Sequence, residues 1–118
     1  MAIEGPLKLN FQLLRDGRPA IGPGKALVMD AIDREGSISA AGRALGMSYR
    51  RAWLLVEGLN SDWRERVIET HVGGGAKTGA RLTDFGRELL AAYRTVEARM
   101  MAASPSAELD WLLGARAP

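Results

Sequence analysis

The chain has 118 residues, of which 47% are apolar and 25% charged, an ordinary composition for one globular domain. Cysteine is absent, which excludes disulfides, thiolate metal sites and cysteine nucleophiles. The formal net charge is only +2, but arginines far outnumber lysines, and the planar guanidinium suits phosphate and guanine. The first residues lack the basic and apolar regions of a signal peptide, and no apolar run is long enough for a membrane span, so a cytoplasmic protein is expected.

The first third of the chain predicts one strand and one helix. Apolar and polar residues alternate from Leu7 to Leu13, which is typical of a half-buried strand, and 16–19 should form a turn. After a further break at 22–24, a helix is expected over 25–35 with four side chains inward: Leu27, Val28, Ala31 and Ile32. Three acids on this helix have no histidine or further carboxylate nearby, so a solvated face is favoured over a metal site: Asp30, Asp33 and Glu35.

The stretch 36–60 predicts two helices joined by a tight turn. Gly36 should end the preceding helix, Gly42 should permit a close approach of two helices, and Gly46 should form the turn. A serine oxygen accepts bonds from free backbone N–H groups at a helix start, so Ser37 or Ser39 should cap the first helix and Ser48 the second. Each helix also has one apolar face: Ile38, Ala41 and Leu45, then Ala52, Leu55, Val56 and Leu59. This is the pattern of a helix-turn-helix, whose second helix enters the DNA major groove.

The opposite face of the second helix carries the candidate base-reading residues. At about 100° per residue from the buried side, three residues point outward: Arg50, Leu54 and Glu57. Arg51 flanks this face, and Tyr49 and Trp53 lie at the edge of the buried one. Arginine near the start of such a helix can bond guanine through two N–H groups, and Leu54 could touch a thymine methyl. The alternative is that Arg50 and Arg51 form only a solvated face.

Positive charge is concentrated between residues 36 and 82. This stretch has a net charge of +3, so the remainder of the chain is slightly acidic. Its basic residues are Arg43, Arg50, Arg51, Arg64, Arg66, Lys77 and Arg81. A basic region that coincides with a helix-turn-helix pattern is the electrostatic footprint that DNA binding requires.

Residues 67–82 predict a β-hairpin with a basic, glycine-rich tip at 73–79. As the wing of a winged helix, it would place three side chains on DNA phosphates: Lys77, Thr78 and Arg81. The competing interpretation, a nucleotide-binding loop, is disfavoured because neither the P-loop nor the dinucleotide motif has its glycines in the required positions. The segment is also expected between strands, whereas both of those motifs open a helix.

The last third of the chain predicts one long helix and one short one. Thr83 should cap a helix that runs to about Ala103, with an apolar stripe shared between the core and a second copy: Phe85, Leu89, Leu90, Tyr93, Val96, Met100 and Met101. Residues 1–103 are then one domain. In 104–118, a last helical turn or two should end at Gly114, before a frayed tail. Four apolar residues there should dock on the body or on a partner chain: Leu109, Trp111, Leu112 and Leu113.

The motifs GSIS, AGRALGMSYRRAW and GGGAKTGARLTDFG, followed by the helix with Tyr93, resemble the DNA-binding domain of the ModE-type molybdate-responsive regulators. The resemblance covers about residues 7–103. It implies an α+β, mainly α fold: a LysR-like winged helix-turn-helix with an N-terminal strand, a β-hairpin wing and a long C-terminal dimerisation helix. It leaves core and interface roles open for Trp53. Complete members carry a C-terminal molybdate-binding module, and the chain stops at Pro118, so no molybdate site is expected on it.

We therefore expect a sequence-specific DNA-binding transcriptional regulator that acts as a homodimer on a palindromic operator, in molybdenum-related regulation. The candidate DNA-binding residues are Ser37, Ser39, Arg43, Ser48, Tyr49, Arg50, Arg51, Leu54, Lys77, Thr78 and Arg81. The alternatives are a winged-helix module that binds protein and a non-specific architectural DNA binder. An enzyme is not expected, because the only histidine, His71, has no nucleophile and carboxylate at a suitable spacing, and no cofactor or metal site is expected.

Overall fold

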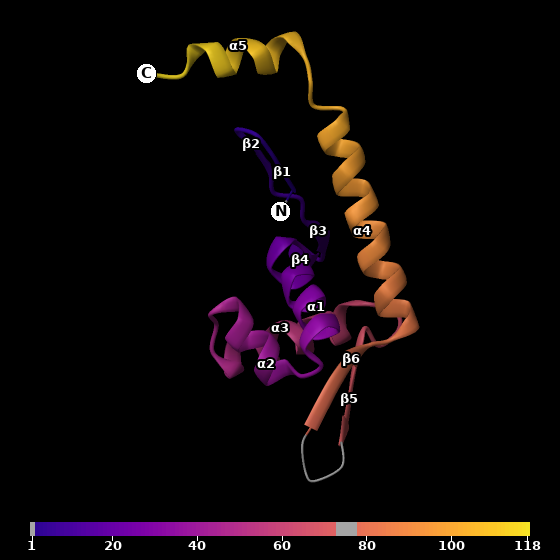
Figure 1. Cartoon of the computed structure of the whole chain (residues 1–118). Coiled ribbons are helices and arrows are strands. Elements are labelled where there is room, and N and C mark those ends of the chain that lie inside the picture. Colours follow the sequence, from indigo (N-terminus) through magenta and orange to yellow (C-terminus); the bar gives the residue numbers. More distant parts are fainter. Residues whose placement is uncertain (1, 73–77) are drawn as a thin grey trace.

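A computed structural model describes residues 2–72 and 78–118, so Lys77 of the predicted wing lies outside the described residues. The molecule is elongated, measuring 58 × 31 × 22 Å. Three helices pack together at one end: α1 (Pro23–Glu35), α2 (Ile38–Leu45) and α3 (Tyr49–Asp62). A hairpin of β5 (Ile68–Val72) and β6 (Thr78–Leu82) projects from this end (Figure 1). The long helix α4 (Asp84–Ala102) leads away from it to α5 (Ala107–Ala115).

The N-terminal segment forms two short hairpins, so the single strand predicted over 7–13 is wrong. Strand β1 (Ala2–Glu4) pairs with β2 (Leu7–Leu9), and β3 (Leu13–Arg15) pairs with β4 (Arg18–Ile21). The chain turns at Gly5 and again at Asp16 and Gly17, all of which have positive φ. Between the hairpins, the Phe11 ring stacks on Tyr93 with ring centroids 4.9 Å apart, and the Phe11 carbonyl accepts the Tyr93 hydroxyl at 2.5 Å. Phe11 therefore contacts α4 and does not pair with a neighbouring strand.

Helix α1 begins at Pro23, inside the break predicted at 22–24. Proline is suited to this first helical position because its missing N–H would have no helical partner there. The helix ends as predicted, since Gly36 is left-handed (φ 80°) and its N–H donates to the Ile32 carbonyl. Leu27, predicted to point inward, is 40% exposed, while the neighbouring Met29 is fully buried.

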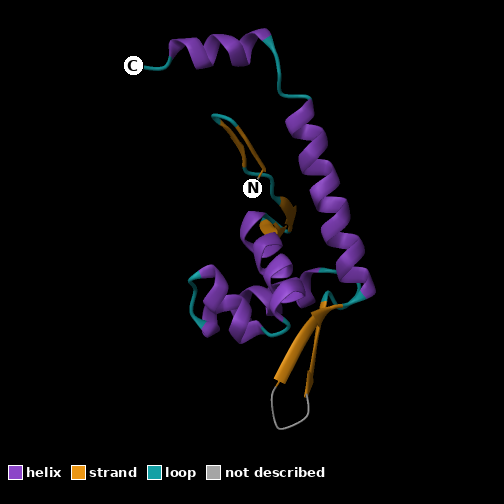
Figure 2. Cartoon of the chain, in the orientation of Figure 1, coloured by secondary structure: helices purple, strands orange, loops and turns teal. Residues whose placement is uncertain are grey.

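The hydrophobic core lies where α1, α2 and α3 meet the base of the β5–β6 hairpin (Figure 2). Its largest fully buried side chains are Ile21, Met29, Ile32, Leu59, Ile68, Leu82, Val28 and Val67. Burying each such side chain contributes about 1.5–3 kcal/mol relative to leaving it in water. This core therefore fixes the two helices of the predicted helix-turn-helix and the hairpin relative to one another.

Helix α4 starts at the predicted cap, because the Thr83 hydroxyl oxygen accepts from the Gly86 N–H at 2.9 Å. Its apolar stripe divides: Tyr93 and Met101 are buried, while Val96 and Met100 are more than a third exposed. Beside the stripe, Arg94 bridges the buried Glu97 and Asp30 of α1. Asp30 therefore ties α1 to α4, which corrects its assignment to a solvated face.

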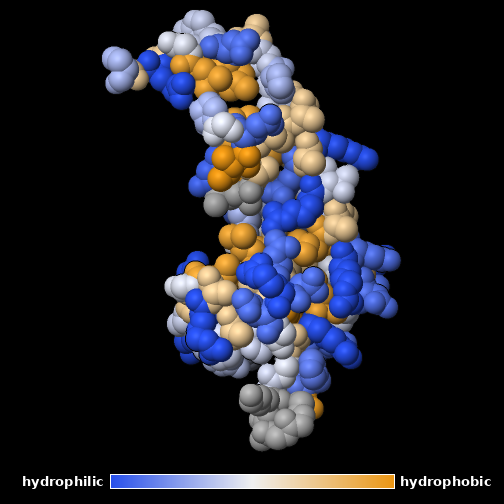
Figure 3. All heavy atoms as spheres, in the orientation of Figure 1, coloured by the Kyte–Doolittle hydropathy of each residue, from blue (hydrophilic) through white to orange (hydrophobic). Residues whose placement is uncertain are grey.

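Helix α5 runs through Gly114 to Ala115, one residue past the predicted end. Leu109 and Leu113 are half-buried beside the β1–β2 turn. Trp111 and Leu112 are 71% and 58% exposed, so the predicted docking of these two on the chain's own body is wrong. Figure 3 shows hydrophobic side chains gathered at this end of the molecule. Docking on a partner chain stays a prediction.

Among the described residues, no helix combines the length and the apolar character that crossing a membrane requires.

Candidate nucleic-acid interface

The turn between α2 and α3 is held by capping bonds at each helix end. The Ser37 hydroxyl oxygen accepts from the Ala40 N–H at 3.0 Å, and that of Ser48 accepts from the Arg51 N–H at 3.1 Å. Gly46 closes α2 in the left-handed conformation (φ 68°) that glycine adopts without strain. These three predicted features are confirmed, and of the two serines weighed as the cap of α2, Ser37 takes that position.

Gly42 permits the close packing of α2 on the turn and on α3. A Cβ atom at this position would lie 3.3 Å from the Met47 carbonyl oxygen and 3.4 Å from the Ala52 Cβ. The Met47 N–H also donates to the Gly42 carbonyl at 2.9 Å. A side chain here would be in tight contact with the turn and with α3, so Gly42 permits their close approach.

Helix α3 buries one face and exposes the other, as predicted. Ala52, Val56 and Leu59 lie in the core. The exposed side carries Arg50, Arg51, Leu54 and Glu57. Two arginines therefore stand in the first turn of a helix whose position is fixed by its opposite face.

Tyr49 and Trp53 are more exposed than their predicted position at the edge of the buried face suggests, at 57% and 42%. They line a hollow of about 480 Å³ between α2, α3 and the hairpin. Ser39 of α2 and Thr78 of β6 border the same hollow. The structure thus brings together three predicted site residues from separate elements, and it places Trp53, whose role the sequence left open, beside them.

The β5–β6 hairpin is joined to the helices through its base. The Ala80 N–H donates to the carbonyl of Gly36, the residue between α1 and α2, at 2.8 Å. Across the strands, His71 faces Gly79, and a Cβ atom at Gly79 would collide with the imidazole ring. A side chain at position 79 would therefore have to displace the exposed His71 ring, which lies across the hairpin from it.

The predicted basic residues differ in how far their charge is neutralised. Arg81 forms an ion pair with Glu69 on the facing strand, with 2.6 Å between Nε and Oε1, so part of its charge is offset. Arg43, Arg50 and Arg51 are exposed and have no ion pair with any residue of 2–72 or 78–118. Among the candidate residues that the structure describes, the uncompensated positive charge therefore lies on α2 and α3.

Sequence reasoning missed Asn60, which joins α3 to the hairpin. Its side-chain oxygen accepts from the N–H groups of Val67 and Ile68 at 2.9 Å each, and its amide donates to the Ile68 carbonyl at 3.0 Å. The sequence offers one signal for this role, which is a polar residue directly after the inward-facing Leu59. Asn60 fixes the spacing between α3 and β5.

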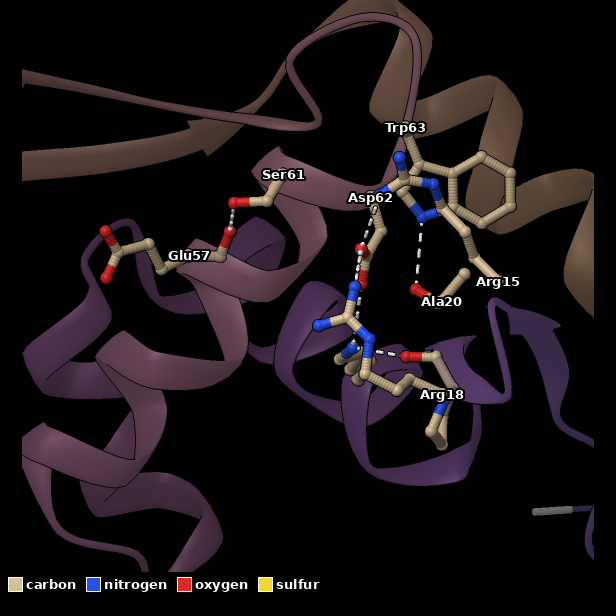
Figure 4. Close-up of polar contacts among 9 residues, drawn as sticks. Arg15, Arg18, Ala20, Glu57, Ser61, Asp62 and Trp63 are labelled. Atoms are coloured by element: carbon tan, nitrogen blue, oxygen red, sulfur yellow. Dashed lines mark hydrogen bonds and ion pairs between the residues drawn. The ribbon is translucent and has the colours of Figure 1, made fainter.

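A second missed feature is the ion cluster at the end of α3 (Figure 4). The Asp62 carboxylate, whose side chain is 6% exposed, lies 3.2 Å from Arg15, 3.5 Å from Arg18 and 3.8 Å from Lys25. Next to it, the Trp63 indole N–H donates to the Ala20 carbonyl at 3.1 Å. This end of α3 is attached to the β3–β4 hairpin and to α1, while the first turns and outer face of α3 stay exposed.

Comparison with known proteins gives a consistent set of relatives, although no protein-family model matches the chain. It is 35% identical over 94 residues to the molybdenum-pterin-binding protein MopA of Rhodobacter capsulatus, covering 80% of this chain and 36% of that protein. It is 42% identical over 78 residues to MopB of the same organism, covering 66% and 29%. It is 31% identical over 87 residues to the DNA-binding transcriptional dual regulator ModE of Escherichia coli, covering 74% and 31%.

The chain spans about a third of the length of the curated relatives it matches. Their names are those of transcriptional regulators and of molybdenum-pterin-binding and molybdenum transport proteins. The matches support the relation to ModE-type proteins that the sequence motifs suggest.

Proposed function

We propose that this chain is a winged helix-turn-helix DNA-binding unit that acts in transcriptional regulation. The observation that carries the proposal is the geometry of α3. This helix is capped, its inner face is in the core, and it presents Arg50, Arg51 and Leu54 on the outer face. Residues in the first turns of a recognition helix are those that reach base edges in the major groove. The arrangement favours direct readout, with an arginine donating two N–H groups to guanine.

The surroundings of α3 supply groups for the phosphate backbone. Ser39, Tyr49 and Thr78 carry hydroxyls beside the hollow between α3 and the hairpin, and a hydroxyl can donate to a phosphate oxygen. Arg43 adds an exposed cation in the last turn of α2. In this proposal, the hairpin is the wing that lies along the DNA backbone.

We further propose that the regulator is a homodimer that binds a palindromic site through two α3 helices. The support is an apolar groove of about 480 Å³ along α4, lined by Phe11, Leu13, Ile21, Trp63, Leu89, Ala92, Tyr93, Val96 and Met100. Two copies joined along α4 could place their α3 helices in successive major grooves, about 34 Å apart. The exposed Trp111 and Leu112 of α5 would extend the same interface.

The regulated process proposed for this chain is related to molybdenum. The support is the printed names of its relatives, which combine transcriptional regulation with molybdenum transport or molybdenum-pterin binding. No enzymatic activity is proposed.

The test is a salt titration of duplex DNA binding by the wild-type chain and two charge-matched variants. Arg50→Ala removes the proposed base contact, so it should weaken binding to a selected site about tenfold or more and relax the preference at one base pair. Arg99→Ala removes an exposed arginine of the last turn of α4 and should leave base preference unchanged. An unchanged preference in Arg50→Ala would refute the readout role. Absence of binding at low salt would refute the DNA-binding function and favour a protein-binding module.

A further inference from the structure

Helix α3 carries two acidic residues in different environments. Asp62, in the last turn, is almost fully buried and faces three cations. Glu57 is exposed, and its side chain points away from that ion cluster (Figure 4). No described residue forms an ion pair with the Glu57 carboxylate. One acid of this helix therefore stabilises the fold, and the other is available to a ligand.

The position of Glu57 on the helix is well defined. Its backbone carbonyl accepts from the Ser61 hydroxyl at 2.8 Å, within the helix. It lies three residues after Leu54 and seven after Arg50, so the three side chains share one exposed face. At 1.5 Å per residue, Leu54 lies about 6 Å along the axis from Arg50, and Glu57 about 4.5 Å beyond Leu54.

A carboxylate at this place would oppose DNA binding if it met only phosphates. The major groove offers it one favourable partner, because cytosine presents an N4 amino donor there and acidic side chains accept from it. Bases along a strand are spaced by about 3.4 Å, so the face from Arg50 to Glu57 extends over about three base-pair steps. Each of its three side chains can thus address a separate base pair.

We infer that Glu57 is a specificity-determining residue that accepts a hydrogen bond from cytosine N4, and that α3 reads three base pairs in order. Arg50 reads a G·C pair, Leu54 touches the thymine methyl of an A·T pair one or two steps further along, and Glu57 reads a second G·C pair beyond it. This inference rests on the proposed DNA-binding function. It adds an acidic contact to a surface otherwise defined by its cations.

The test compares the sites that wild-type, Glu57→Gln and Glu65→Gln chains select from a randomised duplex pool. Glutamine bonds adenine through N6 and N7, so Glu57→Gln should convert only the Glu57 position from a G·C to an A·T preference, by about tenfold. Glu65 is also exposed and lies just after α3, so Glu65→Gln removes the same charge and should leave the consensus unchanged. Circular dichroism spectra should show that both variants keep the fold.

The failure of this inference differs from the failure of the proposed function. If Glu57→Gln retains the wild-type consensus and binds all sequences more tightly, Glu57 only repels phosphates, and the inference is wrong while DNA binding stands. A wild-type consensus without G·C pairs on both sides of an A·T pair would also overturn it. If the wild-type chain selects no sequence or binds no duplex, the proposed function and the inference both fail.

Discussion

The two ends of this molecule differ in how far their side chains are buried or bonded within the chain. At the α1–α3 end, apolar residues from seven elements are buried together, and Asn60 and Asp62 are bonded to neighbouring segments. At the α5 end, large apolar residues remain exposed, including Trp111, Leu112 and Ile3. A protein surface rarely keeps such residues together without a partner. The first end is therefore held together by a shared core, while the exposed apolar residues of the second suit it to association.

The largest expected effect is the difference in stability between a leucine-to-alanine substitution at one end and the same substitution at the other. Leu59→Ala removes a fully buried side chain and should lower the free energy of unfolding by about 2–5 kcal/mol. Leu112→Ala deletes the same atoms from an exposed site and should cost less than about 0.5 kcal/mol. Urea denaturation at equal protein concentration gives both values. Equal losses in the two variants would contradict the comparison.

A somewhat smaller effect is expected from the link between α3 and the hairpin. Asn60→Ala leaves two N–H groups and one carbonyl without their partner, which should cost about 2–3 kcal/mol. Ser61→Ala removes one exposed bond within the helix and should change stability by less than about 0.5 kcal/mol. Amide hydrogen exchange should show lost protection at Val67 and Ile68 in the first variant only. Unchanged protection there would show that the strand is held by other contacts.

At the other end, the expected effect is on association. If α5 contacts a partner chain, Trp111→Ser should raise the dimer dissociation constant about tenfold, since aromatic residues dominate interface energies. Glu108→Gln, an exposed change on the same helix, should leave it unchanged. Sedimentation equilibrium measures both constants. A Trp111→Ser chain that dimerises like wild type would leave α4 as the only candidate interface.

The smallest expected effect is a pH dependence at the junction between the two ends. Burial, reinforced by the nearby Glu97 charge, raises the pKa of Tyr93 above its ordinary value of 10.0. The phenol ionises first in the unfolded chain, so its contribution to stability is present below about pH 10 and is lost as pH rises through the folded-state pKa.

Tyr93→Phe should remove this alkaline loss, at a cost of about 0.5–1.5 kcal/mol at neutral pH for the missing bond to the Phe11 carbonyl. Tyr49→Phe removes a hydroxyl at an exposed site and should change stability at neutral pH by less than about 0.5 kcal/mol. Thermal unfolding between pH 7 and pH 11 measures these differences. A Tyr93→Phe profile identical to that of wild type would contradict the account.

Local signals in the sequence predicted the local features of the fold. Ser48 and Thr83 act as caps, and Gly36 and Gly46 end their helices, because each effect depends on backbone groups within a few residues. The strand over 7–13 was predicted wrongly, because Phe11 is held by Tyr93, 82 residues away. A contact that distant in sequence leaves no local pattern.

The candidate site shows the same limit. The outward direction of Arg50 and Leu54 followed from helical periodicity alone. The pairing of Arg81 with Glu69 depends on hairpin register, and the bonds of Asn60 depend on how the hairpin packs on α3. Neither arrangement could be derived before the tertiary structure was known.

The most direct test of the central claim is a photocrosslinking experiment at two leucines of matched exposure. Leu54 on the outer face of α3 is 49% exposed and Leu27 on α1 is 40% exposed, and each is replaced in turn by the photoreactive benzoylphenylalanine. We expect irradiation with duplex DNA to crosslink the chain through position 54, while position 27 gives at most a background signal. Equal crosslinking at both positions, or none at position 54 when DNA is bound, would contradict the assignment of α3 as the DNA-reading helix.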